Sequence, residues 1–358
     1  MKQLRRIFIA ALPALFCVVL RAGDTGPVHH AAITPSGTHE DAQSGSAPAA
    51  SMGQPVLGYV TQSSGVRLRA ILGVPGSAEL SAALPLPGNV TRVYAAPGQA
   101  YALAERLGDD PAVVALQSGN ALPPAPLAGA IRLPDLVAFS PTGQAALLYS
   151  AAAGLQVITS LPGAPQIART VSASTLPAGI QAAAVSDDGS SVLLAAAGGA
   201  YQLLGGGQTE QVVGATGAAM LAFFPNSSQA AIGDQGSGSV YLWPAATGSV
   251  SAGLLMAGLS GLGAMRASAD GQSLWIANPG GNSIWLLSVH TGSVRTFPLP
   301  VSPSTLDRLP YGEMFLISSD AGQPAWIFFQ QQGEGVASFI PAARDKARHV
   351  IRPEGSHQ

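Results

Sequence analysis

The stretch SVYLWPAATGSV, residues 239–250, returns 44 residues later as SIWLLSVHTGSV, residues 283–294. The first Ser, a Leu and the closing Thr-Gly-Ser-Val match in register. The glycine of this phrase, a short apolar run followed by a Gly-bearing turn, recurs in steps of 41–44 residues at Gly76, Gly119, Gly163, Gly207, Gly248, Gly292 and Gly333. The sequence therefore contains seven copies of one repeat.

A second series of turns runs beside the first. Asp-Gly, Gly-Gln and related turns separate short apolar runs, as in LVAFSPTGQAALLYS, residues 136–150. Such turns are strong hairpin signals. They fall at Gly98, Gly143, Gly189, Ser228, Gly271 and Gly312. Each unit then holds four short strands, and we expect almost no helix because no apolar run has a helical period.

A period of 41–44 residues with four strands is typical of a β-propeller blade. The stretches SPTGQ, GSGSVYLWPAATG and SADGQSLWIANPGGNSIWLLSVHTG resemble the blades of WD-repeat and YVTN-type propellers, and the resemblance covers most of residues 53–342. The bacterial secreted YVTN-like group is the closer likeness, because Pro244 and Ser288 stand where WD repeats place their Asp. The resemblance implies a fold and little about function.

We therefore predict an all-β, seven-bladed β-propeller of four-stranded blades, closed by N- and C-terminal strands. The first unit begins with a Gly-Gln turn at Gly53, yet SAPAAS before it does not read as an innermost strand. A bare sheet edge would remain unless another segment supplied that strand. The sequence HVIR, residues 349–352, is the candidate.

The N-terminus is typical of an export signal. Lys2, Arg5 and Arg6 precede a 14-residue apolar run at residues 7–20, which is short for a membrane span. We predict a signal peptide at 1–22, a flexible Gly/Ser/Pro/Ala-rich spacer at 23–52, the propeller at 53–352 and a tail at 353–358. The protein is then periplasmic or extracellular, with an uncleaved N-terminal membrane anchor as the alternative. Cleavage would leave no membrane span and would remove Cys17, the one cysteine.

The composition narrows the function classes. The net charge of −2 gives no reason to expect nucleic acid as a partner. His290 is the one histidine between Val56 and Ala342, and its place in a turn predicts a solvated rim residue. Asp187 and Asp188 lack the spacing of a calcium loop, so a hairpin turn explains them.

We expect no cofactor, no resident metal and a monomer. Trp243, Trp275, Trp285 and Trp326 are expected in the core, with a sugar-binding surface as the alternative.

Charged residues gather in the loops that join consecutive blades and middle strands, where they either solvate loop tips or form a polar binding patch around a channel mouth. These residues are Arg92, Arg106, Asp109, Asp110, Arg132, Asp135, Asp234, Asp307, Arg308 and Asp320. The candidate binding set consists of Arg92, Arg106, Asp110, Arg132, Asp135, Arg266, Asp307 and Arg308.

The register of the innermost strands gives a sharper prediction. Five positions before the turn glycine stand Val93, Ala138 and Ala184 in three units, but Arg266 and Asp307 in the last two. Neighbouring innermost strands would bring these two charges together as a pair, either structural or at a polar channel site. Arg308 would replace Asp307 if Pro310 shifted the register.

The leading functional hypothesis is an exported, non-enzymatic propeller that binds a protein or envelope component. The alternative is a lactonase-like hydrolase on the same scaffold, with a metal held at the channel mouth.

Overall fold

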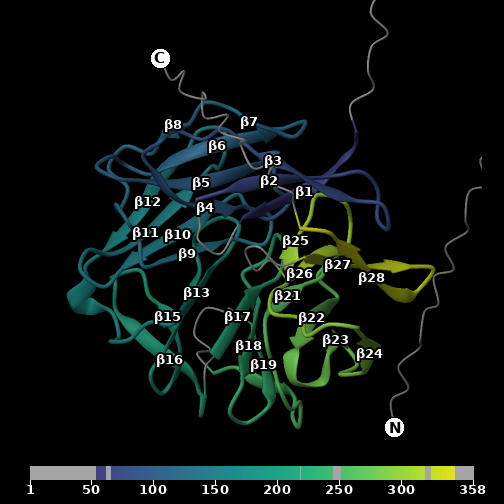
Figure 1. Ribbon diagram of the computed structural model, residues 1–358. Coiled ribbons are helices and arrows are strands. Elements are labelled where there is room, and N and C mark those ends of the chain that lie inside the picture. Colours follow the sequence, from purple (N-terminus) through teal and green to yellow (C-terminus); the bar gives the residue numbers. More distant parts are fainter. Residues whose placement is uncertain (1–53, 62–65, 218, 245–250, 319–323, 343–358) are drawn as a thin grey trace, which may run out of the picture. The chain divides into compact units, whose positions relative to one another are not determined.

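Seven antiparallel sheets form this protein, and they follow one another around a centre in chain order (Figure 1). The computed structural model describes residues 54–61, 66–217, 219–244, 251–318 and 324–342. The predicted signal peptide (1–22), spacer (23–52) and tail (353–358) lie outside the described residues, and so does the end of the predicted propeller, 343–352, with the candidate closing strand at 349–352. Within the described ranges, helix is confined to two 3-10 turns, η1 (Ala173–Thr175) and η2 (Pro279–Gly281). No helix in these ranges is long and apolar enough to cross a membrane.

Each sheet is one blade, and five blades have four strands in sequential order. Blade 3 holds β9 (Leu136–Phe139), β10 (Ala146–Ser150), β11 (Gly154–Thr159) and β12 (Gln166–Val171). Blade 4 holds β13 (Ala182–Val185), β14 (Val192–Ala196), β15 (Gly199–Leu203) and β16 (Thr209–Gly214). Blade 5 holds β17 (Ala219–Phe223), β18 (Ala230–Asp234), β19 (Ser239–Trp243) and β20 (Gly253–Met256). Blade 6 holds β21 (Met265–Ala267), β22 (Ser273–Asn278), β23 (Ser283–Ser288) and β24 (Val294–Pro298). Blade 7 holds β25 (Asp307–Arg308), β26 (Met314–Ser318), β27 (Ala325–Gln331) and β28 (Glu334–Ile340).

The first two blades differ from this pattern. Blade 2 holds β4 (Val90–Ala95), β5 (Tyr101–Arg106) and β6 (Ala112–Gln117), with the short β7 (Asn120–Ala121) and β8 (Ala125–Pro126) both pairing with β6. Blade 1 has three described strands, β1 (Val56–Thr61), β2 (Leu68–Leu72) and β3 (Glu79–Ala83). The prediction of a seven-bladed, all-β propeller is confirmed.

Burial between blades explains why the sheets form a ring. Seven clusters of buried apolar side chains each join two neighbouring blades. One of them joins the last blade to the first through Ile71 of β2 and Leu316 and Ile327 of blade 7. Strands that are apolar on both faces have no solvent side, so they can be stable only between two other sheets.

The tryptophans belong to this packing, as the sequence predicted. Trp243 and Trp275 are buried, and Trp285 and Trp326 are partly buried. Trp275 of blade 6 contacts the rings of Phe315 and Phe328 of blade 7 at 5.5 and 5.6 Å between centroids. These contacts leave the two fully packed tryptophans unable to form a sugar-binding surface.

Candidate functional site

A central cavity of about 400 Å³ is lined by the innermost strands of blades 2 to 7. Small side chains on these strands keep it open, among them Ala95, Ala138, Ala183, Ala184 and Ala222. Val93, Arg266 and Asp307 line it too, together with Tyr59 and Thr61 of β1. The five positions that the register count selected therefore all line one cavity.

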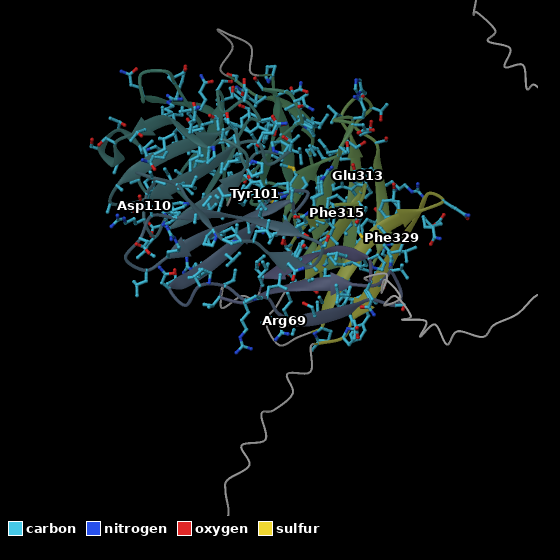
Figure 2. All side chains as sticks on the ribbon, turned by 90° about the horizontal axis from the view of Figure 1, so that it is seen from above. Arg69, Tyr101, Asp110, Glu313, Phe315 and Phe329 are labelled. Atoms are coloured by element: carbon cyan, nitrogen blue, oxygen red, sulfur yellow. The ribbon has the colours of Figure 1, made fainter. Side chains whose placement is uncertain are left out.

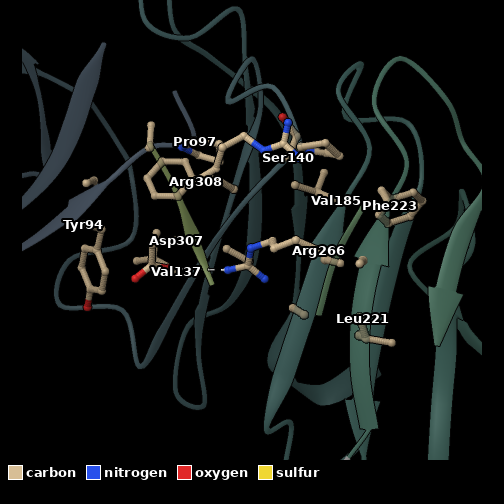
Figure 3. Close-up of a pocket in the computed structure, with 18 of the residues that line it drawn as sticks. Tyr94, Pro97, Val137, Ser140, Val185, Leu221, Phe223, Arg266, Asp307 and Arg308 are labelled. Carbon is tan, nitrogen blue, oxygen red and sulfur yellow. Dashed lines mark ion pairs between the residues drawn. The ribbon is translucent and has the colours of Figure 1, made fainter. Parts of the chain in front are cut away.

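Arg266 and Asp307 face each other across neighbouring innermost strands (Figure 3). Arg266 Nη2 lies 3.8 Å from Asp307 Oδ1, so the predicted pairing is confirmed and Arg308 does not take the place of Asp307. The two side chains are 46% and 47% exposed. Water reaches both side chains, so neither would become a buried, unpaired charge if the other were removed. A half-exposed pair at this distance contributes about 0–1 kcal/mol to stability.

Arg308, the next residue, has a different role. Its side chain is only 16% exposed, and Nη2 donates to the carbonyl oxygen of Ala267 at 2.5 Å and lies 3.4 Å from Glu313 Oε2. Its guanidinium lies over the ring of Phe315. Burial lowers the pKa of Arg308, and the negative charge of Glu313 acts in the opposite direction. Its hydrogen bonds join blade 7 to blade 6, which leaves Arg308 little freedom to bind a partner.

A second polar group lies on blade 2. The hydroxyl of Tyr94 donates to the buried carboxylate of Glu105 at 2.6 Å, and burial together with this bond raises the pKa of Tyr94 to about 12. A hydrogen bond with Tyr94 is the main reason why the pKa of the exposed Arg92 is raised, and Asp135 contributes through its charge. Sequence analysis selected Arg92 and Asp135 but missed Tyr94, which carries no charge, and Glu105, which lies inside β5.

The other candidates form a separate rim cluster where blade 2 meets blade 3. Arg132 Nε lies 2.8 Å from Asp110 Oδ1, and Arg106 Nε donates to the Asp110 carbonyl at 2.8 Å. The hydrogen bond from Arg132 is the main cause that lowers the pKa of Asp110. Figure 2 shows Asp110 at the edge of the molecule, well apart from Glu313. The eight candidates thus do not form one patch.

Asp234 is not a solvated loop tip, which corrects the sequence-based expectation. It is 1% exposed and accepts hydrogen bonds from the backbone N–H groups of Thr216, Gly217 and Gly236 at 3.0–3.1 Å. Burial is the largest influence and raises its pKa, but the hydrogen bonds together outweigh it and bring the pKa to about 2. Its role is to hold the loop before β17. Asp320 lies outside the described residues.

Metal-ligating side chains and histidine are sparse among the described residues. No three His, Cys, Asp or Glu side chains gather there in a way that could hold a metal ion. His290, the one histidine among the described residues, is exposed in the turn between β23 and β24. The Oδ1 atom of Asp187 accepts bonds from Thr142 and its Oδ2 from Asn226, so this carboxylate is engaged by neighbouring turns.

Comparison with known proteins supports the fold alone. No protein-family model matches this sequence, and no curated protein matches it either. A functionally unknown protein from Desulfotomaculum acetoxidans has a similar structure, with a TM-score of 0.53, 13% identity, and coverage of 81% of this chain and all of that chain. A protein from Bacteroides fragilis named as a candidate 6-phosphogluconolactonase has a TM-score of 0.52 and 14% identity, with coverage of 82% of this chain and 95% of that chain. The β-propeller domain of Cps50 (Swd1) from Myceliophteria thermophila has a TM-score of 0.45 and 11% identity, with coverage of 80% of this chain and 96% of that chain.

Proposed function

We propose that this chain is an exported, non-enzymatic β-propeller that binds a protein or another component of the cell envelope at its central cavity. The observation that carries the proposal is the half-exposed pair of Arg266 and Asp307 above a cavity walled by small apolar side chains. Rigid strands present both charges, so a partner would meet a fixed arrangement without an ordering cost.

The contrast with Arg308 supports this assignment. Arg308 is bound to Ala267 and Glu313, whereas Arg266 and Asp307 are joined by one long, half-exposed contact. Exchanging that contact for charges on a partner would cost the fold about 1 kcal/mol at most. Tyr94 also lines this cavity (Figure 3), so a ligand bound there would meet an aromatic side chain as well as the two charges.

The proposal predicts that reversing the two charges abolishes binding without unfolding the protein. In the double variant Arg266→Asp with Asp307→Arg, the pair persists but its pattern is inverted. We expect proteins captured from an envelope extract by the wild-type chain to be lost from this variant. The measurement is chemical crosslinking followed by mass spectrometry, with the melting temperature recorded for both proteins.

A matched control uses the outer pair Arg295 and Glu334, which also lies at 3.8 Å. The exchange Arg295→Glu with Glu334→Arg should leave capture unchanged. Equal capture by the cavity variant and the wild type would overturn the assignment. A divalent ion that copurifies with the protein, together with a lower melting temperature on chelation, would instead favour the metal-dependent hydrolase.

Export is tested separately. The mature protein should be recovered from the periplasm or the medium with an N-terminus that follows Ala22. A chain that keeps its first 22 residues in the membrane fraction would show the anchored alternative.

A further inference from the structure

The wall of the central cavity has an apolar side and a charged side. The innermost strands of blades 3 to 5 form the apolar side, which includes Val137, Ala183 and Leu221. These three side chains are only partly buried, as is every residue of β9. Blades 6 and 7 form the charged side with Arg266 and Asp307. A ligand that fits this cavity therefore has an apolar part and a polar end.

The hydrogen-bonding groups of Arg266 and Asp307 are available to a ligand. The 3.8 Å between Arg266 Nη2 and Asp307 Oδ1 exceeds the length of a hydrogen bond, which is about 2.7–3.2 Å. Arg266 also donates from Nη1 to the carbonyl oxygen of Met265 at 3.0 Å, which helps to hold the guanidinium in place. A guanidinium has five N–H donors, and a carboxylate has about four acceptor positions. Both side chains can therefore bond to a ligand while they stay where they are.

A guanidinium beside a carboxylate matches the end of a peptide chain. The last residue of a peptide carries an α-carboxylate, which a guanidinium binds through two N–H groups, and a backbone N–H, which a carboxylate accepts. The nitrogen and the carboxylate carbon of one residue are about 2.5 Å apart. One terminal residue can therefore reach two side chains that lie as close together as Arg266 and Asp307.

The charge of the cavity favours a C-terminus over a free amino acid. Three of the residues described as lining the cavity are charged, and two of them, Arg266 and Arg308, are positive. Burial lowers the pKa of Arg308, and the positive charge of Arg266 adds to that effect, so the two arginines repel each other. A peptide C-terminus brings a negative charge that reduces this repulsion, whereas the ammonium group of a free amino acid cancels its carboxylate.

The size of the cavity agrees with a chain end. Its volume of about 400 Å³ lies within the range of small-ligand pockets, about 300–1,000 Å³. Such a space accepts the last residue or two of a chain but not a folded surface.

We propose that the central cavity binds the C-terminal residue of a partner protein, and that this residue has an apolar side chain. Arg266 binds the α-carboxylate and Asp307 accepts the backbone N–H of the same residue. The side chain of that residue lies against the apolar side of the cavity. This inference rests on the proposed function and specifies which part of the partner enters the cavity.

Four synthetic peptides test the inference on the full-length protein by ligand-observed NMR titration. The reference probe is acetyl-Ala-Ala-Leu with a free carboxylate. Its C-terminal amide should bind at least about ten-fold more weakly, because it lacks the charge-assisted bond to Arg266. N-methylation of the terminal Leu and its replacement by Gly should each weaken binding several-fold. Equal affinities of the free acid and the amide would overturn the proposal.

Two variants assign the interactions to their side chains. Arg266→Gln should remove the preference for the free acid over the amide, and Arg295→Gln of the outer pair should leave that preference unchanged. Asp307→Ala should remove the preference for the N–H peptide over the N-methyl peptide. Unchanged preferences in Arg266→Gln or Asp307→Ala would contradict the assignment. Melting temperatures verify the fold of each variant, and the peptide series on the unmodified protein stays decisive if a variant does not fold.

The same titrations separate this inference from the proposed function. Free leucine that binds as tightly as the acetylated tripeptide would overturn the inference in favour of an amino acid site. Capture from an envelope extract that depends on the charges of Arg266 and Asp307, without any preference for the free acid, would overturn the inference and leave the proposed function standing. Charge-dependent capture together with a preference for the free acid would support both.

Discussion

At the residue scale, a few carboxylates hold neighbouring turns together. Asp187 is buried, and it accepts hydrogen bonds from the backbone and hydroxyl of Thr142 at 2.8 and 2.6 Å and from the Asn226 backbone at 2.7 Å. These partners stand in the Gly-Gln turns of the blades on either side. Asp188 is exposed and bonds only within its own turn, to Ser186 and Ser190. Adjacent residues of the same type thus do different work.

We predict that Asp187→Ala destabilises the protein by about 3 kcal/mol, because two backbone N–H groups lose a charged acceptor. Asp188→Ala should cost about 1 kcal/mol, since Ser190 is open to water and the buried Ser186 hydroxyl keeps the Ser191 carbonyl oxygen as an acceptor. Chemical denaturation of both variants, with equal m-values, measures the difference. A larger loss in Asp188→Ala would show that the interblade bonds contribute little.

At the element scale, the pairing between the third and fourth strands shifts by one register position in blades 3, 4 and 5. Register shifts occur between β11 and β12, between β15 and β16, and between β19 and β20. At the start of β11, Gly154 has a φ of +98°, and a Cβ there would overlap the carbonyl oxygen of Val171. The phrase glycine Gly163 has open space around it. In blade 3, therefore, the phrase glycine is not the position where glycine is needed most.

Gly154→Ala should destabilise the protein by at least about 2 kcal/mol through backbone strain and this overlap. Gly163→Ala should change stability by less than about 0.5 kcal/mol. Thermal melts of the two variants under identical conditions provide the comparison. A tolerated alanine at 154 would mean that β12 can move away from β11.

At the scale of the whole molecule, stability depends on packing between blades. Trp275 of blade 6 is 1% exposed and meets Phe297 of its own blade as well as Phe315 and Phe328 of blade 7. Such a residue links two sheets that share no strand pairing. Trp326 is only partly buried: it lies against the margin of the apolar cluster that contains Trp275 and packs on the half-exposed Phe339 of its own blade.

Trp275→Ala should cost about 3–5 kcal/mol, because it leaves a cavity between two blades. Trp326→Ala should cost less than half of that, since Trp326 is only partly buried. Both values follow from denaturant titration monitored by circular dichroism, which does not depend on the tryptophans. Similar losses in the two variants would argue that blade interfaces and blade surfaces are equally packed.

The sequence by itself determined the number of blades, their strand order and the pairing of Arg266 with Asp307. These follow from periodic turns, and a strand with period-two geometry fixes which residues share a face once the turn is placed. The same reasoning predicted that the first blade would differ from the others, and it has three strands among the described residues.

Only the tertiary structure decided how much water surrounds each charge. Asp234 and Arg308 proved enclosed, Arg266 and Asp307 half exposed, and Glu105 a buried acceptor for Tyr94. The hydrogen bonds between the Gln99 side-chain amide and the Tyr59 backbone were likewise not predictable from the repeat pattern of the sequence. Burial and such long-range contacts are set by neighbouring blades, whose side chains lie 40 residues or more away in the sequence and carry no local signal at the position that they cover.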